Sequence, residues 1–215
     1  TLSMDAQQDL EESLKKYVDE DEEIQEYTYR EEVLSDGKTE SVRYTVTAIG
    51  ENVLGNNVSV KEIIVPFSVE RIENKAFRNS VLTTVTFEAG SKLRSIGEDA
   101  FRSCSSLRSI SLPDGVTSIG KRAFYESALT EFSTNVTSDL KEIGAYAFYG
   151  CVNFAGTVDD TEKGFYAKKD LVTVANYAFS HSGIVEFGIP ESSNSLKAIG
   201  KEAFANCYYI KKVTI

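Results

Sequence analysis

The dipeptide Ala-Phe recurs six times in this chain of 215 residues, and its spacing constrains the fold more than any other feature. The intervals between successive copies are 24, 23, 24, 31 and 25 residues, for copies that begin at Ala76, Ala100, Ala123, Ala147, Ala178 and Ala203. Such spacing is typical of a repeat protein, in which one unit cannot bury its own apolar residues and stacked units share a core. The sequence therefore predicts a solenoid in which equivalent Phe residues stack into an interior ladder.

Other residue types keep fixed places around this dipeptide. Four residues before each Ala stands a β-branched residue, usually followed by glycine: Ile72, Ile96, Ile119, Ile143, Val174 and Ile199. A related copy at residues 49–54, with Val-Leu in place of Ala-Phe, brings the number of units to about seven. The glycines are expected at corners whose backbone conformation resists side chains. Each unit ends with apolar residues in alternation, as in Leu107-x-x-Ile110-x-Leu112, which predicts a short half-buried strand.

Two kinds of unit alternate along the chain. Three residues after the Phe site comes a small residue, followed by an apolar site that lies either two positions further on or three. The longer spacing follows Asn57, Cys104, Cys151 and Cys207, and the shorter one follows Ser80, Ser127 and Ser182. The structural period is therefore expected to be a pair of units of about 47 residues.

The string Ile-Gly-x-x-Ala-Phe-x-x-Cys-x-x-Leu-x-x-Ile-x-Leu-Pro is complete at residues 96–113 and resembles the BspA-like leucine-rich repeat family over roughly residues 46–215. The resemblance implies a leucine-rich repeat solenoid with a short parallel sheet. It also implies an exported, surface-associated protein of a host-associated bacterium. Some members of the family take part in adhesion to host proteins or cells. The Asn ladder of other leucine-rich repeats is missing, and the Cys/Ser sites take a comparable position.

Residues 1–45 are expected to cap the first repeat. An acidic amphipathic helix is predicted over residues 1–23, with Leu10, Leu14, Tyr17 and Val18 on one face. A hairpin is predicted over residues 24–49, with its turn at Ser35–Lys38, Tyr27 and Tyr29 in one arm, and Val42, Tyr44, Val46 and Ala48 in the other. The expected class is thus an α+β repeat fold, with a cap over 1–45 and a solenoid over 46–215.

The interval of 31 residues, from Ala147 to Ala178, is seven or eight residues too long, which places an insertion within residues 158–171. Its sequence is polar apart from Phe165 and Tyr166, and we expect a surface hairpin or loop. Insertions in repeats are sometimes functional, although more of them are tolerated without having a function.

The sequence lacks the residue groups that catalysis or cofactor binding requires. His181, the one histidine, has no nucleophile or orienting carboxylate near it in sequence, so no enzyme and no catalytic residue is predicted. Cys104, Cys151 and Cys207 lack paired Cys-x-x-Cys spacing, which favours buried free thiols over a metal site. The acidic run at residues 19–23 lacks the pattern of a calcium loop. No metal or other cofactor is expected.

Charge and hydropathy exclude further classes of partner. The net charge is −10, and residues 1–40 carry all of it, with 14 acidic against 4 basic side chains. No basic stripe is present, so no nucleic-acid partner is expected. No apolar run approaches the roughly 20 residues of a membrane helix, so this segment is not expected to enter a membrane. The first residues do not form a signal peptide, and an export signal is presumed removed from an extracellular or cell-surface protein.

The expected binding surface is the outward side of the strands, because side chains that flank a buried strand residue must point to solvent. The candidate contact residues on this surface are Glu62, Thr84, Thr86, Ser109, Ser111, Glu131, Ser133 and Glu186. Phe165 and Tyr166 of the insertion are an alternative contact point. The partner is expected to be a protein or glycan on host or neighbouring cells. The rows contain few Tyr, Trp or Arg anchors, which leaves a second hypothesis, a structural spacer that holds another domain off the cell surface.

Overall fold

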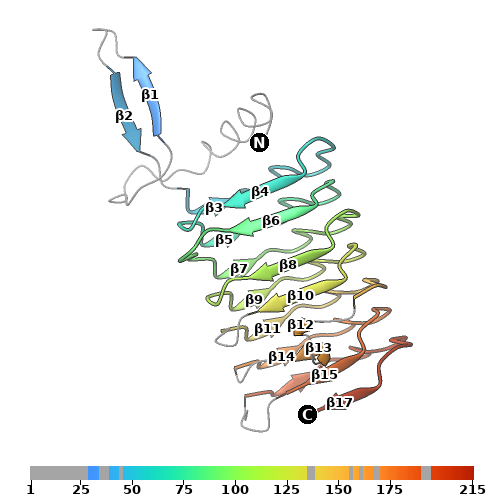
Figure 1. Ribbon diagram of the computed structural model, residues 1–215. Helices are drawn as coiled ribbons and strands as arrows, with labels where there is room; N and C mark the ends of the chain where they lie inside the picture. The colour runs from blue at the N-terminus through green and yellow to red at the C-terminus, as the bar shows by residue number, and fades with distance from the viewer. Residues whose placement is uncertain are drawn as a thin grey trace.

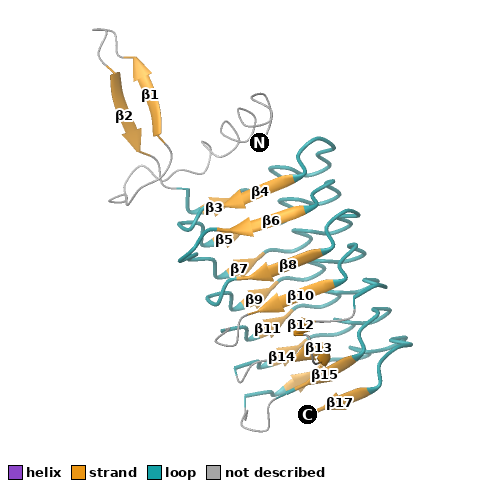
Figure 2. Cartoon of the chain, in the orientation of Figure 1, coloured by secondary structure: helices purple, strands orange, loops and turns teal. Residues whose placement is uncertain are grey.

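The computed structural model describes residues 29–33, 39–43, 46–134, 139–154, 157–159, 162–166, 170–189 and 195–215. From residue 46 onward the chain winds as a stack of turns with a layer of strands on each side (Figure 1). The described residues form strands, turns and loops but no helix (Figure 2). The fold is therefore a parallel β-solenoid, and the expected α+β class is not supported. The helix expected over residues 1–23 lies outside the described residues.

The back sheet is built from the β-branched site of each unit. It has seven parallel strands of two residues each: β3 (Ala48–Ile49), β5 (Arg71–Ile72), β7 (Ser95–Ile96), β9 (Ser118–Ile119), β11 (Glu142–Ile143), β14 (Thr173–Val174) and β16 (Ala198–Ile199). Six turns therefore separate the first strand from the last. The sequence predicted one strand per unit and missed this second sheet, because two residues are too few for alternation to appear.

Glycines stand directly after most of these strands because neighbouring turns approach closely there. A Cβ added at Gly120 would lie 2.7 Å from the carbonyl carbon of Gly97, and one at Gly144 would lie 2.6 Å from that of Gly120. Neither glycine has a positive φ, so the expected conformational reason is wrong. Left-handed backbone falls instead on other residues of each turn, such as Asp99 and Glu126. The glycines are needed for packing between turns.

The front sheet carries the predicted half-buried strands. Its strands are β4 (Glu62–Val65), β6 (Thr84–Phe87), β8 (Ser109–Leu112), β10 (Glu131–Thr134), β13 (Glu162–Tyr166), β15 (Glu186–Gly188) and β17 (Lys212–Thr214). Exposed and buried residues alternate along β4 and β8, as predicted. Among the inward residues of these strands, Ile63, Ile110 and Phe132 are buried. Val213 is 45% exposed, because β17 is the edge strand of its sheet.

The expected phenylalanine ladder forms the centre of the core. Phe77, Phe101, Phe124, Phe148 and Phe179 have no exposed surface, and Phe204 is partly buried at the end of the row. Successive ring centroids lie 5.0 to 5.4 Å apart. Stacked rings at this separation are a favourable aromatic geometry. From Phe77 onward, the ladder therefore links each turn to the next through one continuous apolar column.

The small residue of each unit explains why long and short units alternate. The thiol of Cys104 donates to the carbonyl oxygen of Phe77 at 3.1 Å and lies 3.5 Å from Oγ of Ser80. Cys151 and Cys207 repeat both contacts with the preceding short unit. A serine and a cysteine thus satisfy each other across each short-to-long junction. The pair of units is the true period of the stack.

The three cysteines are buried and free, as predicted. Burial raises the pKa of Cys104 to about 11 and that of Cys151 to about 12, and it also raises the pKa of Cys207. Only the thiolate is an efficient nucleophile. We expect an aromatic disulfide reagent at pH 8 to label the folded protein far more slowly than the unfolded protein. Labelling of native thiols as fast as that of an exposed cysteine in a Ser105→Cys variant would contradict this.

The same pKa shifts predict how stability depends on pH. The unfolded thiol has a pKa of about 9.0, and the folded protein holds the proton more tightly. The stabilisation is therefore fully present below pH 9 and is lost as the pH rises from 9 through about 11. Chemical denaturation across this range should show the free energy of unfolding falling, and replacing Cys151 by serine should make the fall smaller.

The N-terminal hairpin is present in part as expected. β1 (Tyr29–Val33) pairs antiparallel with β2 (Thr39–Arg43), and Val42 lies in the second arm. Val46 and Ala48 do not belong to this arm: Val46 is buried in the solenoid core and Ala48 begins the back sheet. Tyr27, Tyr44 and the turn at Ser35–Lys38 lie outside the described residues. The capping role of residues 1–45 stays a prediction.

Candidate functional site

We use the name front face for the outward side chains of β4, β6, β8, β10, β13, β15 and β17. Strand register places Glu62 beside Thr84 and Ser109 beside Glu131 in one row. The second row pairs Thr86 with Ile64 and Ser111 with Ser133. The predicted contact residues on the four N-terminal front strands thus point to the same side. All are exposed except Ser133, which is half-buried like Glu186 on β15.

The front sheet is not one continuous ladder. β4 pairs with β6, β8 pairs with β10, and β12 (Thr157–Asp159), β13, β15 and β17 form a third group. β6 and β8 belong to a short-to-long junction, where the cysteine–serine contact holds the turns together inside the core. Their facing edges are not joined in the hydrogen-bonded ladder that the structure describes. The front face is therefore open between β6 and β8.

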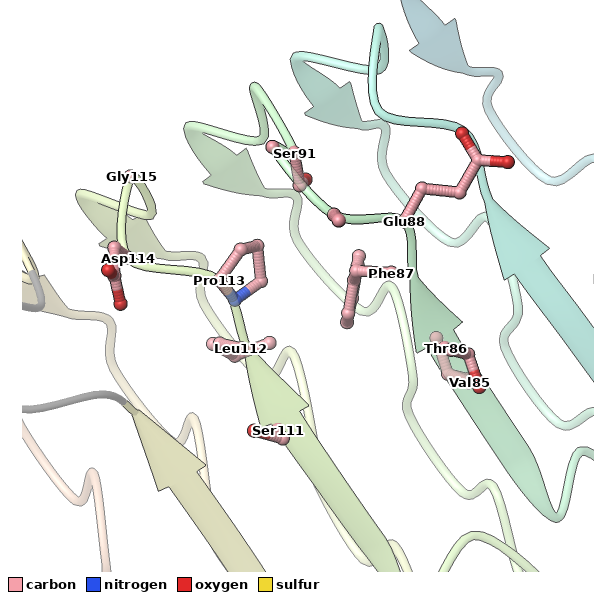
Figure 3. A pocket seen from close by; sticks show the side chains of 12 residues that line it. Val85, Thr86, Phe87, Glu88, Ser91, Ser111, Leu112, Pro113, Asp114 and Gly115 are labelled. Carbon is pink, nitrogen blue, oxygen red and sulfur yellow. The ribbon is translucent and has the colours of Figure 1, made fainter.

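Two adjoining depressions lie at this opening, and we call them together the β6–β8 groove. One has a volume of about 490 Å³ and is lined by residues 85–91 and 111–115. The other has a volume of about 370 Å³, and Thr84, Ser109, Ser111, Glu131 and Ser133 help to line it. Figure 3 shows the first depression between the ends of β6 and β8, with Phe87 reaching toward Leu112 and Pro113. The groove thus brings together most of the predicted contact residues.

The chemistry of the β6–β8 groove suits binding. Thr and Ser hydroxyls both donate and accept hydrogen bonds, and the Glu131 carboxylate accepts them. Val85 and Ile110 supply a small apolar floor. No histidine, lysine or cysteine lines either depression. The described ranges contain no group of three His, Cys, Asp or Glu residues that could hold a metal ion.

The insertion contributes to the front sheet itself. Phe165 on β13 is 3% exposed, and its ring stacks between those of Phe132 and Phe187 at centroid distances of 5.9 Å on both sides. Thr157, on the neighbouring strand β12, pairs with Gly164 of β13. The insertion forms the expected hairpin, because β12 pairs antiparallel with β13, but the expectation that Phe165 is available as a contact residue is wrong, because its ring is buried. The inserted residues thus add a strand, β13, that places an aromatic side chain in the core.

Tyr166 lies on the front face beside this buried ring. Its hydroxyl donates to Oε2 of Glu186 at 2.6 Å. A Cβ at Gly188 would lie 2.8 Å from Cδ1 of the ring, and one at Gly164 would lie 3.0 Å from Cε2. The ring therefore occupies space that two glycines leave open, and the side chain remains half-buried. Tyr166 is placed where the alternative contact point was expected.

A column of planar side chains runs along the turns that follow the Phe sites. Arg102 lies over Tyr125, Tyr125 stacks on Tyr149, and Tyr149 contacts His181, each at 4.9 to 5.0 Å. The sequence analysis assigned no catalytic role to His181 and missed this column, although Arg102, Tyr125 and Tyr149 occupy one repeat position. Nδ1 of His181 lies 3.0 Å from the Ser180 hydroxyl, with no carboxylate among its hydrogen-bond partners in the described structure. The column contributes stacking between turns.

Comparisons with known proteins agree with this architecture. The family model for the BspA type leucine-rich repeat region matches residues 22–155 and 163–215 in six copies. A search of curated proteins finds no match. Within the part of the chain that the structure describes, no helix is long and apolar enough to cross a membrane.

Several solved structures are similar to this chain at low identity. The pneumococcal vaccine antigen PcpA is 19% identical with a TM-score of 0.46, and the match covers 79% of this chain and 56% of that one. The leucine-rich repeat protein of T. pallidum is 21% identical with a TM-score of 0.44, covering 85% and 88% of the two chains. A leucine-rich cell surface protein of Faecalibacterium prausnitzii is 19% identical with a TM-score of 0.32, covering 90% and 77%.

Proposed function

Since the chain belongs to the BspA-type leucine-rich repeat family, we propose that it is a non-catalytic, surface-exposed binding module. Its front face recognises a protein or glycan on host or neighbouring cells. The observation that carries this proposal is the β6–β8 groove, where the front-sheet ladder is interrupted and hydroxyl and carboxylate side chains converge. Solenoids use extended faces of this kind for recognition.

The alternative function is a structural spacer that holds another domain off the cell surface. The small polar residues Thr84, Thr86, Ser109 and Ser111 favour it, because tight interfaces usually rest on Trp, Tyr and Arg. A spacer role, however, does not require an interruption in the front sheet. The front-face carboxylates of Glu62, Glu131 and Glu186 also oppose binding of nucleic acid. We therefore place binding first, at an extracellular or cell-surface location.

Four lysines in the groove should abolish adhesion. In the variant, Thr84, Thr86, Ser109 and Ser111 are each replaced by Lys, which fills the groove with long cationic side chains. Beads coated with the full chain are applied to epithelial cells or to extracellular matrix, and retained beads are counted. We expect retention to fall about tenfold or more, as for a loss of roughly 1.4 kcal/mol in binding free energy.

The matched control carries the same added charge on the opposite side. Ser95, Ser118, Thr173 and Ala198 are the outward residues of back-sheet strands, and each is replaced by Lys. This variant should adhere like the natural chain. Equal adhesion of the front variant, the back variant and the natural chain, with all three folded by circular dichroism, would favour the spacer over a binding module.

A further inference from the structure

Arg78 occupies the repeat position of Arg102, Tyr125 and Tyr149, one turn before the first of them. Those three side chains and His181 form the column described above, which we call the turn column. The Arg78 side chain is half-buried, and its Nε is buried without a hydrogen-bond partner in the described structure. A buried polar atom of a charged group is costly when it is left unpaired, so such an atom in a native protein requires an explanation.

The carboxylates on the turns around Arg78 are engaged with other cations. Those on its own turn and on the two neighbouring turns form these ion pairs: Glu51 with Lys75, Glu73 with Arg71, Glu98 with Lys121 and Arg122, and Asp99 with Arg102 and Arg122. Residues 46–134 are described without a gap, and within them Arg78 forms no ion pair. Its positive charge therefore lacks an anion in this part of the chain.

A second guanidinium group stands on the next turn. The backbone amide of Asn79 donates to the carbonyl oxygen of Arg102 at 2.8 Å, so Arg78 and Arg102 lie on directly adjacent turns. The ion pair of Arg102 with Asp99 is long, at 3.7 Å, and Asp99 also accepts two shorter hydrogen bonds from Arg122. Because like charges on adjacent turns repel, an anion that meets both arginines would be attracted by each of them.

Uncharged hydrogen-bonding groups occupy the turn that precedes Arg78. Gly55 brings no side chain to the column position there, and a Cβ added to it would overlap Oδ1 of Asn52. One residue later on each turn stand the exposed amides of Asn56 and Asn79, joined by a hydrogen bond of 2.9 Å from Nδ2 of Asn79 to Oδ1 of Asn56. The neighbours of Arg78 on this side are thus amides rather than carboxylates.

We propose that Arg78 and Arg102 bind the carboxylate or sulfate group of an acidic glycan. A guanidinium group presents its N–H donors in a planar fork that matches two oxygens of such an oxyanion. The bound oxyanion supplies the partner that the Arg78 side chain lacks and offsets the repulsion between the two arginines. This site lies on the turns and shares no residue with the front face, so it goes beyond the proposed function.

A glycan fits this surface better than an acidic peptide does. Every side chain of residues 73–80 and 97–104 that reaches solvent is polar or charged, and none is apolar or aromatic. Protein interfaces depend on aromatic anchors as well as on arginine. The amides of Asn56 and Asn79 donate and accept hydrogen bonds, as sugar hydroxyls do. One acidic sugar can therefore place its oxyanion on the arginines and its hydroxyls on the asparagines.

Calorimetry with the full chain tests this site against two acidic hexasaccharides, the hexamer of α-1,4-linked galacturonic acid and a sulfated heparin hexasaccharide. At least one should bind, and more weakly as salt is raised. Arg78→Gln should weaken that binding about tenfold or more, because a charge-assisted hydrogen bond is lost. Arg78→Lys keeps the charge without the planar fork and should weaken it less. The matched control is Arg108→Gln, which removes an exposed arginine beside β8 and should bind normally.

Three results would overturn the glycan assignment. They are the absence of binding to both hexasaccharides, equal binding by the natural chain and folded Arg78→Gln, and tighter binding of hexaglutamate than of either hexasaccharide, which would indicate an acidic peptide. If Arg78→Gln does not fold, Arg102→Gln replaces it with the same expected loss.

The bead assay reports separately on the proposed function. Loss of adhesion in the front lysine variant with unchanged hexasaccharide binding supports two separate sites. Loss of hexasaccharide binding in that variant would place the acidic glycan on the front face and overturn the site at Arg78.

Discussion

Replacing Phe124 by alanine is expected to lower the free energy of unfolding by about 3–5 kcal/mol, the usual cost of deleting a buried aromatic side chain. The ring has no exposed surface and stacks on Phe101 at 5.2 Å and on Phe148 at 5.3 Å. In a solenoid each turn contacts only its neighbours, so a cavity in the middle weakens both adjoining contacts. Urea denaturation followed by circular dichroism measures the change.

Phe204 offers a matched control at the end of the same ladder. It stacks on Phe179 at 5.4 Å but is only partly buried. Phe204→Ala should therefore cost clearly less than Phe124→Ala, because part of its surface already contacts water. If the two substitutions cost the same, or if Phe124→Ala costs under about 1 kcal/mol, the ladder is not the continuous core described above.

Replacing Phe165 by alanine is expected to destabilise the protein by a similar amount, about 3–5 kcal/mol. Its ring is 3% exposed and stacks between Phe132 and Phe187, although it belongs to the insertion. A decorative surface loop would tolerate this change. Thermal and urea unfolding of Phe165→Ala and of the neighbouring Tyr166→Ala provide the comparison.

Tyr166→Ala should cost much less than Phe165→Ala, because Tyr166 is half-buried on the front face. Equal and small losses for both variants would show that the insertion does not belong to the core. The same reasoning predicts that deleting residues 159–166 removes a core ring. Such a deletion would therefore confuse instability with loss of binding, and point substitutions are the better probe of this segment.

Much of the fold could be predicted because its core residues recur at fixed intervals. The Phe ladder and the alternation around Ile63 and Ile110 follow from spacing and from the two-residue period of a strand. The back sheet could not be predicted, since its strands have two residues each. The packing role of Gly120 also could not be predicted. Gly97 approaches it only because neighbouring turns stack, and the sequence of a single unit does not show this contact.

The candidate site was predictable in its residues but not in its shape. Alternation places Thr84, Thr86, Ser109 and Ser111 on the outward side. The groove between them depends on missing strand pairing between β6 and β8, which no single unit reveals. The alternation of long and short units does not predict the opening, because β15 and β17 flank another short-to-long junction and are paired. The burial of Phe165 was not predicted, because the apolar content of the insertion is low. This one residue is enough to place part of the insertion in the core.

Hydroxyl-radical footprinting of the full chain, free and adhering to cells, tests directly whether the front face is covered in the bound state. Ile64 is 66% exposed and Tyr166 half-buried on the front face, whereas Tyr125 and Tyr149 lie on the turn column. The labelled residues are identified by mass spectrometry. We expect adhesion to protect Ile64 and Tyr166 from labelling and to leave Tyr125 and Tyr149 unchanged. Protection of Tyr125 and Tyr149 with full labelling of Ile64 and Tyr166 would contradict binding through the front face.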